Sequence, residues 1–256
     1  MTRKSYPDGR AHRPSGGLRH PSERLIVALD VPTDGEALSL VDLLLPDVKF
    51  FKVGLELFVA SGPSVVSGVR ERGGRVFLDL KLHDIPNTVK RAVSCATRLG
   101  AAIISLHLSA GRECLESAAE GIEEGSSRTS ERPLLAGVTV LTSLGSEQAG
   151  DTAGSVLEQV LRLSRLAKEC GIGGIITSVR EAADVRRALG GECVIITPGI
   201  RLRGPQDDHK RAGTVRDALL AGSDYLVVGR PITRASNPLE EAKRFLNEIA
   251  AFDSID

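Results

Sequence analysis

The stretch "FLDLKLHDIPNTV" (residues 77–89) begins as a buried strand, and Pro86 then turns the chain toward a helix. Apolar residues dominate the strand, but four charged or titratable side chains interrupt it or follow it: Asp79, Lys81, His83 and Asp84. Burying such groups is costly unless they are paired. The stretch therefore combines a strand-to-helix unit with a polar cluster that needs an explanation.

The same unit, a short β-branched strand followed by a helical stretch, repeats along the chain. Strand candidates lie at 24–31, 48–54, 75–81, 101–108, 134–141, 173–178, 193–199 and 224–230. All but the seventh precede a stretch with helical spacing, such as residues 155–170. This alternation implies a parallel sheet, and eight units predict a single-domain α/β fold, a (β/α)8 TIM barrel. A doubly wound open sheet is the alternative, weakened because no GxGxxG follows the first strand.

The composition narrows the possible partners and the compartment. Lys plus Arg equals Asp plus Glu at 33 each, so the net charge of zero gives no support for a nucleic-acid or membrane partner. No apolar run approaches the ~20 residues of a spanning helix. Four cysteines without CxxC or metal-ligand spacing favour a reducing cytoplasm: Cys95, Cys114, Cys170 and Cys193.

Residues 1–23 differ from the rest of the chain. They hold five Lys or Arg, three Pro and three Gly, and they lack the apolar core of a secretory signal. We expect a disordered basic extension here, followed by the barrel domain at residues 24–256. A tail that contacts nucleic acid or a protein partner is the alternative.

Charged residues fall where the predicted strands end, and barrel active sites lie at the C-terminal ends of their strands. Asp30 ends the first predicted strand, Lys52 the second, and Asp79 with Lys81 the third. Because Asp79 and Lys81 are two residues apart, we expect both to face the barrel mouth. Asp84 lies past the strand end, in a loop. An inert polar plug is the alternative, but four charges at three consecutive strand ends favour an active site.

Two later segments have features that are typical of phosphate-binding loops. "TPGIR" (197–201) places Arg201 after the seventh strand, and "VVGRPI" (227–232) places Gly229 and Arg230 after the eighth. Barrel phosphate sites commonly use these two loops, and arginine binds phosphate oxygens with two donors. We therefore expect a phosphorylated substrate.

These segments together resemble the orotidine 5′-phosphate decarboxylases, which form UMP. The resemblance extends over residues 24–247 and rests on "VALD", "FKVG", "FLDLKLHDIPNTV", "GVTVLTS", "TPGIR" and "VVGRPIT", which follow the order and spacing of that family. It implies decarboxylation of orotidine 5′-phosphate to UMP and CO2 by a homodimer that needs neither metal nor cofactor.

The resemblance also implies a role for each charged residue. Lys81 would be the general acid that protonates C6 of the pyrimidine, and Asp79 would crowd the substrate carboxylate. Lys52 would complete the charge network and, with Asp30, contact the ribose. The residues implied to reach the site from the second subunit are Asp84, Ile85 and Thr88.

The remaining substrate contacts are implied in the same way. Thr142 matches the position that hydrogen-bonds the pyrimidine edge, and the phosphate grip matches Arg201, Gly229 and Arg230. Many relatives carry a phosphate-binding glutamine where this chain has His209, with Gln206 as a rival under a shifted alignment. "LHLSAG" (106–111) replaces the more usual "HASGG", which we interpret as a local loop change.

Two other functions compete with this interpretation. A metal-dependent sugar-phosphate decarboxylase or aldolase of the same superfamily carries an acidic metal ligand where this chain has Lys52, so we expect no metal. A catalytically silent barrel that binds a phosphate ligand is disfavoured because every charged position of the motif is present.

Overall fold

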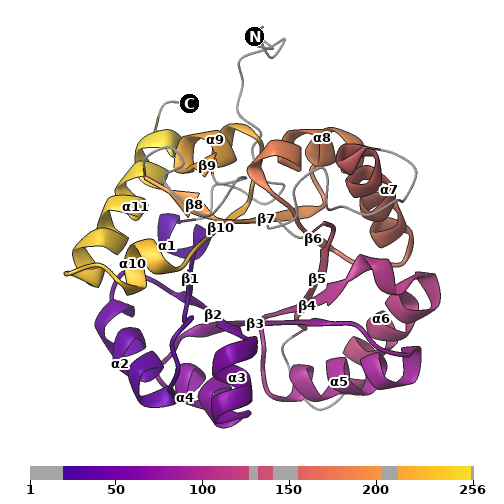
Figure 1. The fold of residues 1–256 in the computed structure, drawn as a ribbon, viewed down its shortest axis with the longest axis horizontal. Helices are drawn as coiled ribbons and strands as arrows, with labels where there is room; N and C mark the ends of the chain where they lie inside the picture. The colour runs from indigo at the N-terminus through magenta and orange to yellow at the C-terminus, as the bar shows by residue number, and fades with distance from the viewer. Residues whose placement is uncertain (1–19, 127–131, 141–154, 203–212, 255–256) are drawn as a thin grey trace, which may run out of the picture.

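The computed structural model describes residues 20–126, 132–140, 155–202 and 213–254. Eight parallel strands close into a barrel in the order β1-β10-β7-β6-β5-β4-β3-β2, and helices surround it (Figure 1). The barrel strands are β1 (Leu25–Ala28), β2 (Phe50–Gly54), β3 (Arg75–Leu82), β4 (Ile103–His107), β5 (Leu134–Val138), β6 (Gly174–Ile176), β7 (Val194–Pro198) and β10 (Tyr225–Val228). Each coincides with one of the eight expected strands. The predicted single-domain TIM barrel is confirmed, and the open-sheet alternative is wrong.

The connecting helices follow the expected order. They are α2 (Asp34–Leu44), α3 (Leu55–Ser61), α4 (Ser64–Glu71), α5 (Pro86–Arg98), α6 (Arg112–Ser126), α7 (Val156–Glu169), α8 (Val179–Leu189), α9 (Val215–Leu220), α10 (Arg230–Thr233) and α11 (Pro238–Asp253), with a short 3-10 turn η1 (Leu108–Ala110). The start of α7 shows why these segments are helical. Ser155 and Glu158 cap each other's backbone N–H groups, and Val160 and Leu163 bury the inner face. Within the described ranges, no helix is both long and apolar enough to cross a membrane.

The seventh unit is the irregular one, as the sequence suggested. Between β7 and α9 the chain forms a small parallel pair, β8 (Ile200–Arg201) and β9 (Gly213–Thr214). Thr214 then caps α9, accepting a hydrogen bond from the N–H of Asp217. Arg201 therefore lies in a short strand that pairs with β9 outside the barrel sheet.

The N-terminal boundary differs from the expected one. Residues 21–23, placed in the disordered extension, belong with Arg24 to a short helix, α1 (Pro21–Arg24). Arg24 is buried, donates to the carbonyl of Ser223, and forms an ion pair with Asp253 at 2.7 Å. These long-range contacts hold the segment against the barrel. The rest of the expected extension, residues 1–19, lies outside the described residues.

The barrel interior explains where the charges lie. The part of the interior nearer the N-terminal ends of the strands is a packed apolar cluster. Its members are Ile26, Ala28, Phe50, Phe77, Ile103, Ala136, Val138, Ile176, Ile196, Tyr225 and Val227. Side chains two residues apart on a strand share a face, so Lys52 follows Phe50 and Asp79 follows Phe77 on the inward side. The interior thus changes from apolar to charged toward the C-terminal ends of the strands, which we call the C-terminal mouth.

Candidate active site

Four charged side chains on β2 and β3 and just after β1 meet at the C-terminal mouth in alternating sign; we call them the charge network. Lys52 Nζ lies 3.0 Å from Asp30 Oδ1 and 3.6 Å from Asp79 Oδ2. Lys81 Nζ donates to the same Asp79 Oδ2 at 2.7 Å. The expected clustering of these residues is confirmed, with every neighbour of opposite charge.

Their positions along the strands differ from the expected strand ends. Asp30 lies two residues beyond the end of β1, and Lys52 is the central residue of β2, level with Ala28. Asp79 pairs with Gly54, which lies two residues beyond Lys52 on β2. The charged residues of β2 and β3 therefore do not pair directly with each other across the sheet. Strand stagger in a closed barrel brings such residues to a common height.

Asp79 is the centre of the charge network and is only 7% exposed. Burial alone would raise the pKa of its carboxyl group, but the charges of Lys52 and Lys81 outweigh burial and hold that pKa below its usual value. Asp79 is therefore an anion at neutral pH. Its second oxygen, Oδ1, is buried and has no hydrogen-bond partner among the described residues, which leaves an acceptor inside the mouth.

Lys81 lies in a distorted part of β3. Its φ of +51° is the only positive φ at a non-glycine residue within the described ranges. The pairing with β4 shifts between Leu78 and Leu82, so β3 contains extra residues there. Such bulges re-aim side chains and are frequent beside active sites, and a left-handed non-glycine residue costs on the order of 1–3 kcal/mol. Lys81 reaches the mouth beside Asp79, as expected, but from an irregular stretch of β3 and not from a regular alternating strand.

Ser105 holds this bulge in place and was missed from the sequence. Its Oγ accepts a hydrogen bond from the backbone N–H of Lys81 at 2.8 Å, and its side chain is fully buried on β4. A hydroxyl buried in an apolar strand needs a partner. The signal was available: Ser105 interrupts the apolar run "AAIISL" (101–106).

Gly54 is a second residue that the sequence did not mark. A Cβ at this position would lie 3.0 Å from Lys52 Nζ and 3.4 Å from Asp30 Oδ1. Gly229 plays a similar part, since a Cβ there would lie 3.3 Å from Asp30 Oδ2. Both glycines leave the space that the Asp30–Lys52 ion pair occupies.

A pocket of about 180 Å³ opens beside the charge network. Its lining includes Arg201 of β8, Gly229 and Arg230 at the start of α10, and Asp30 and Lys52 of the charge network. Arg201 Nε is buried and lacks a hydrogen-bond partner in the described part of the chain. An arginine N–H left unpaired in such a pocket favours an anionic ligand. The segments that follow β7 and β10 thus border one pocket.

The other predicted site residues lie apart from the network. Asp84 is exposed and accepts a hydrogen bond from the N–H of Ile85 at 2.6 Å. Ile85 is 66% exposed, and Thr88 is exposed in the first turn of α5. In the described part of the chain, none of the three forms an ion pair or side-chain hydrogen bond with the network. The predictions for Thr142, His209 and Gln206 lie outside the described residues.

Two histidines lie beside Lys81, and neither was assigned a role. The rings of His83 and His107 are 5.5 Å apart between centroids. Burial, together with the charges of His83 and Lys81, lowers the pKa of His107, so this ring is neutral at pH 7. Within the described ranges, no group of three or more His, Cys, Asp or Glu side chains is placed to hold a metal ion.

Comparison with known proteins places this geometry in a family. A family model described as "Orotidine 5'-phosphate decarboxylase / HUMPS family" matches residues 23–245. The orotidine 5'-phosphate decarboxylase of Moorella thermoacetica is 45% identical over 235 residues, which cover 90% of this chain and 93% of the relative. That of Laribacter hongkongensis is 46% identical over 228 residues, 88% of this chain and 91% of the relative.

Solved structures agree with the sequence comparisons. The crystal structure of orotidine 5'-phosphate decarboxylase from Lactobacillus acidophilus matches with a TM-score of 0.79 at 34% identity, covering 89% of this chain and 99% of that chain. The enzyme from Pyrococcus horikoshii matches with a TM-score of 0.72 at 25% identity, covering 88% and 99%. By sequence and fold, the chain belongs to the orotidine 5'-phosphate decarboxylase / HUMPS family.

Proposed function

We propose that the protein decarboxylates orotidine 5′-phosphate to UMP and CO2 without a metal or an organic cofactor. The observation that carries the proposal is the alternating charge network, in which two lysines flank the buried carboxylate of Asp79. Relatives at 42–46% identity that are named orotidine 5'-phosphate decarboxylase support the same activity.

The C-terminal mouth has two parts, the pocket and the charge network, and they match the phosphate end and the pyrimidine end of this substrate. The phosphate occupies the pocket of Arg201, Gly229 and Arg230, where the buried Nε of Arg201 needs an acceptor. His209 adds a hydrogen bond to this phosphate, with Gln206 as the alternative donor. The pyrimidine then extends toward Asp79 and Lys81.

The ribose and the base complete the placement. The ribose hydroxyls lie against Asp30 and Lys52, which border both the phosphate pocket and the charge network. Thr142 hydrogen-bonds the pyrimidine edge. Binding is thus spread over the length of the nucleotide, while the reaction takes place at one end of it.

The chemical step breaks the bond between C6 and its carboxylate. The electron pair of that bond stays on C6 as CO2 leaves, and Lys81 Nζ then gives a proton to C6 and later recovers one from solvent. Asp79 faces the substrate carboxylate, so their repulsion is relieved as CO2 departs. The lysine ammonium that Asp79 holds at 2.7 Å stabilises the developing negative charge.

The size of each energy shows how much each interaction contributes to lowering the reaction barrier. Two like charges about 4 Å apart repel by roughly 4 kcal/mol at an effective dielectric constant near 20. The most proficient enzymes lower their barriers by about 23 kcal/mol. Repulsion by Asp79 is therefore a minor contribution, and Lys81 together with remote phosphate binding carries most of the effect.

The donor set argues against the metal-dependent alternative. Both carboxylates that could offer oxygen ligands, Asp30 and Asp79, are already paired with the ammonium of Lys52. A divalent cation would have to displace that ammonium or approach it closely. Measuring turnover of orotidine 5′-phosphate in the presence of EDTA tests the proposal: undiminished turnover is expected. Loss that Mg²⁺ restores would favour the metal-dependent branch, and no turnover in either condition would favour a silent binding barrel.

The active protein is a homodimer whose sites are shared. Three exposed hydrophobic residues, Leu55, Val59 and Ile85, lie on elements that directly follow β2 and β3, beside the mouth. We take these exposed apolar side chains as part of an association surface. Burying them against a second copy places Asp84, Ile85 and Thr88 at the partner's site. The compartment is the cytoplasm, consistent with four unpaired cysteines.

Mixing two inactive variants tests the shared site. Lys81→Ala and Asp84→Ala are each expected to be nearly inactive. After exchange of subunits, one site of each mixed dimer carries both substitutions and the other carries neither. With random pairing, about a quarter of wild-type activity returns. If exchange is verified by mass and no activity returns, Asp84 does not act across the interface.

A further inference from the structure

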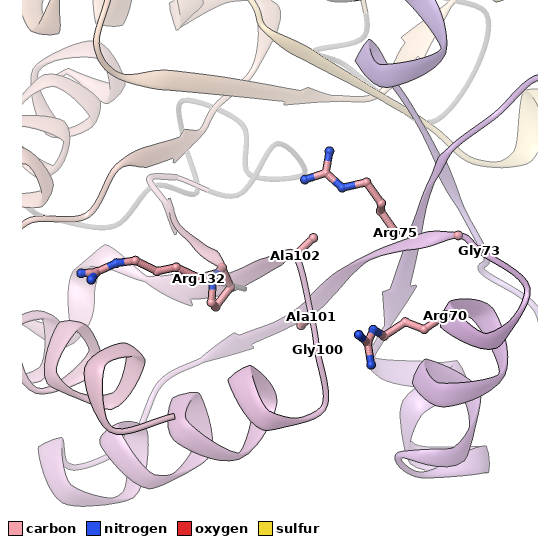
Figure 2. A pocket seen from close by; sticks show the side chains of 9 residues that line it. Arg70, Gly73, Arg75, Gly100, Ala101, Ala102 and Arg132 are labelled. Atoms are coloured by element: carbon pink, nitrogen blue, oxygen red, sulfur yellow. The ribbon is translucent and has the colours of Figure 1, made fainter. Parts of the chain in front are cut away.

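A second concave site lies at the opposite end of the barrel, where the N-terminal ends of β3, β4 and β5 begin. It has a volume of about 470 Å³, and three arginines border it: Arg70 at the end of α4, Arg75 at the start of β3 and Arg132 before β5. Figure 2 shows them around the backbone of Gly100, Ala101 and Ala102. We call this site the N-terminal hollow.

Each arginine is held in place by a contact of its own. Arg70 Nη1 donates to the carbonyl of Leu99 at 3.3 Å, and its guanidinium lies so close to Gly100 that a Cβ there would be 2.1 Å from Cζ. The guanidinium of Arg75 lies 4.5 Å from the centre of the Phe50 ring. Such contacts reduce the side-chain entropy lost when a ligand binds.

The charge of the hollow is only partly balanced. Arg132 forms an ion pair with Glu123, whereas neither Arg70 nor Arg75 forms one with a carboxylate in the described part of the chain. Among the described residues, no acidic side chain lines the hollow. Glu23 lines the adjoining pocket, beside Arg75 and Arg132. A chain with zero net charge thus concentrates positive charge here.

We propose that the N-terminal hollow is a second anion-binding site, which takes a small molecule with two or more linked phosphate groups. In Figure 2 the three guanidinium groups point in different directions, that of Arg132 away from the backbone of Gly100 to Ala102, so one compact anion cannot contact all of them. A chain of phosphates can span them, and arginine binds each phosphate through two N–H groups. The volume lies within the roughly 300–1,000 Å³ of small-molecule sites, and three arginines around one concavity do not form the extended basic stripe of a nucleic-acid surface.

Titration calorimetry with inorganic tripolyphosphate at physiological salt tests the proposal. We expect the full-length protein to bind one equivalent, and the double substitution Arg70→Gln/Arg75→Gln to raise Kd at least tenfold. The matched control is Arg187→Gln/Arg244→Gln, which removes the same charge from two exposed arginines on α8 and α11 and is expected to leave Kd unchanged. Arg230→Ala, which alters the pocket at the C-terminal mouth, is also expected to leave this binding unchanged.

Several results would overturn the proposal. They are loss of binding in Arg230→Ala, an equal loss in the control double variant, binding of inorganic phosphate as tight as that of tripolyphosphate, and tighter binding of a single-stranded RNA that the Arg70/Arg75 substitutions abolish. If the double variant has a lowered Tm, the single substitution Arg75→Lys is tested in its place. This variant keeps the charge but loses the paired N–H groups, so a several-fold rise in Kd is expected, and an unchanged Kd contradicts the assignment.

Discussion

The two ends of strand β3 carry opposite charges in opposite surroundings. Arg75, Phe77 and Asp79 follow one another at every second position along the strand. Asp79 is buried between Lys52 and Lys81 at one end, whereas Arg75 is exposed over the ring of Phe50 at the other. In a low-dielectric site each charge needs an opposite neighbour, while water screens the exposed end. Charge at a strand end therefore indicates chemistry only where burial and alternation of sign accompany it.

Backbone strain separates the two ends in the same way. Lys81 adopts a φ of +51° and is held there by Ser105, while the backbone near Arg75 contains a positive φ only at a glycine, Gly73. A protein retains such a strained residue where the surrounding structure over-determines it. The combination of strain, burial and pairing distinguishes the C-terminal mouth as the reactive end.

The largest expected effect contrasts Lys81 with Arg75. Lys81→Ala removes the proposed proton donor, so kcat should fall by roughly 1,000-fold or more while UMP still binds. Arg75→Ala should keep kcat within about twofold, because it alters only the far end of the strand. Spectrophotometric turnover and calorimetric UMP binding measure both. If Lys81→Ala keeps more than a few per cent of the wild-type kcat, Lys81 is not the general acid.

Two arginines allow a second contrast between the ends. Arg230→Ala should raise KM and lower kcat/KM by the equivalent of about 2–5 kcal/mol, because it borders the phosphate pocket. Arg70→Ala, at the N-terminal hollow, should leave both constants near the wild-type values. Equal turnover of phosphate-free orotidine and the nucleotide by the wild type would contradict the phosphate assignment.

Gly54 tests how closely the charge network is packed. Gly54→Ala places a Cβ 3.0 Å from Lys52 Nζ, so the ammonium must move and kcat/KM should fall by about 10–100-fold. The control is Gly35→Ala in α2, where a Cβ would meet nothing within 4 Å. If both variants keep full activity, the Asp30–Lys52 pair tolerates displacement and its position is not critical.

The buried carboxylate of Asp79 predicts a dependence of stability on acid pH. Its pKa is lowered in the folded state, so it stabilises the protein above the usual carboxyl pKa near 3.8, and this contribution is lost as pH falls through the folded value. Urea unfolding from pH 6 down to about pH 2 should show this loss below pH 3.8, and Asp79→Asn should weaken it. An identical profile in Asp79→Asn would show that other carboxylates account for acid unfolding.

The smallest expected effect concerns the strained backbone at Lys81. Lys81→Gly should be more stable than Lys81→Ala by about 1 kcal/mol, because glycine adopts a positive φ without steric cost. Both variants lack the ammonium, so their difference isolates the backbone. Chemical denaturation compares them; a less stable glycine variant would show that the bulge is not strained.

Much of the fold and the site could be predicted from local pattern. The repeat of strand and helix units, each encoded over a short stretch, was enough to predict a closed parallel barrel. The alternation that places Asp79 above Phe77 was also local, and so were the two loops that carry Arg201 and Arg230 to one pocket. Such features follow from periodicity and chain order, which are properties of the sequence itself.

Other features depend on residues far apart in the sequence. The direction of Lys81 is decided by a bulge against β4 and a hydrogen bond to Ser105, and the need for Gly54 by the ion pair that fills its space. The N-terminal hollow joins Arg70, Arg75 and Arg132, and no motif links them. The sequence by itself determined the barrel and the identity of its charged residues. Only the tertiary structure decided which of them are buried, strained and paired, because these properties arise from contacts between strands and loops that close only in the folded chain.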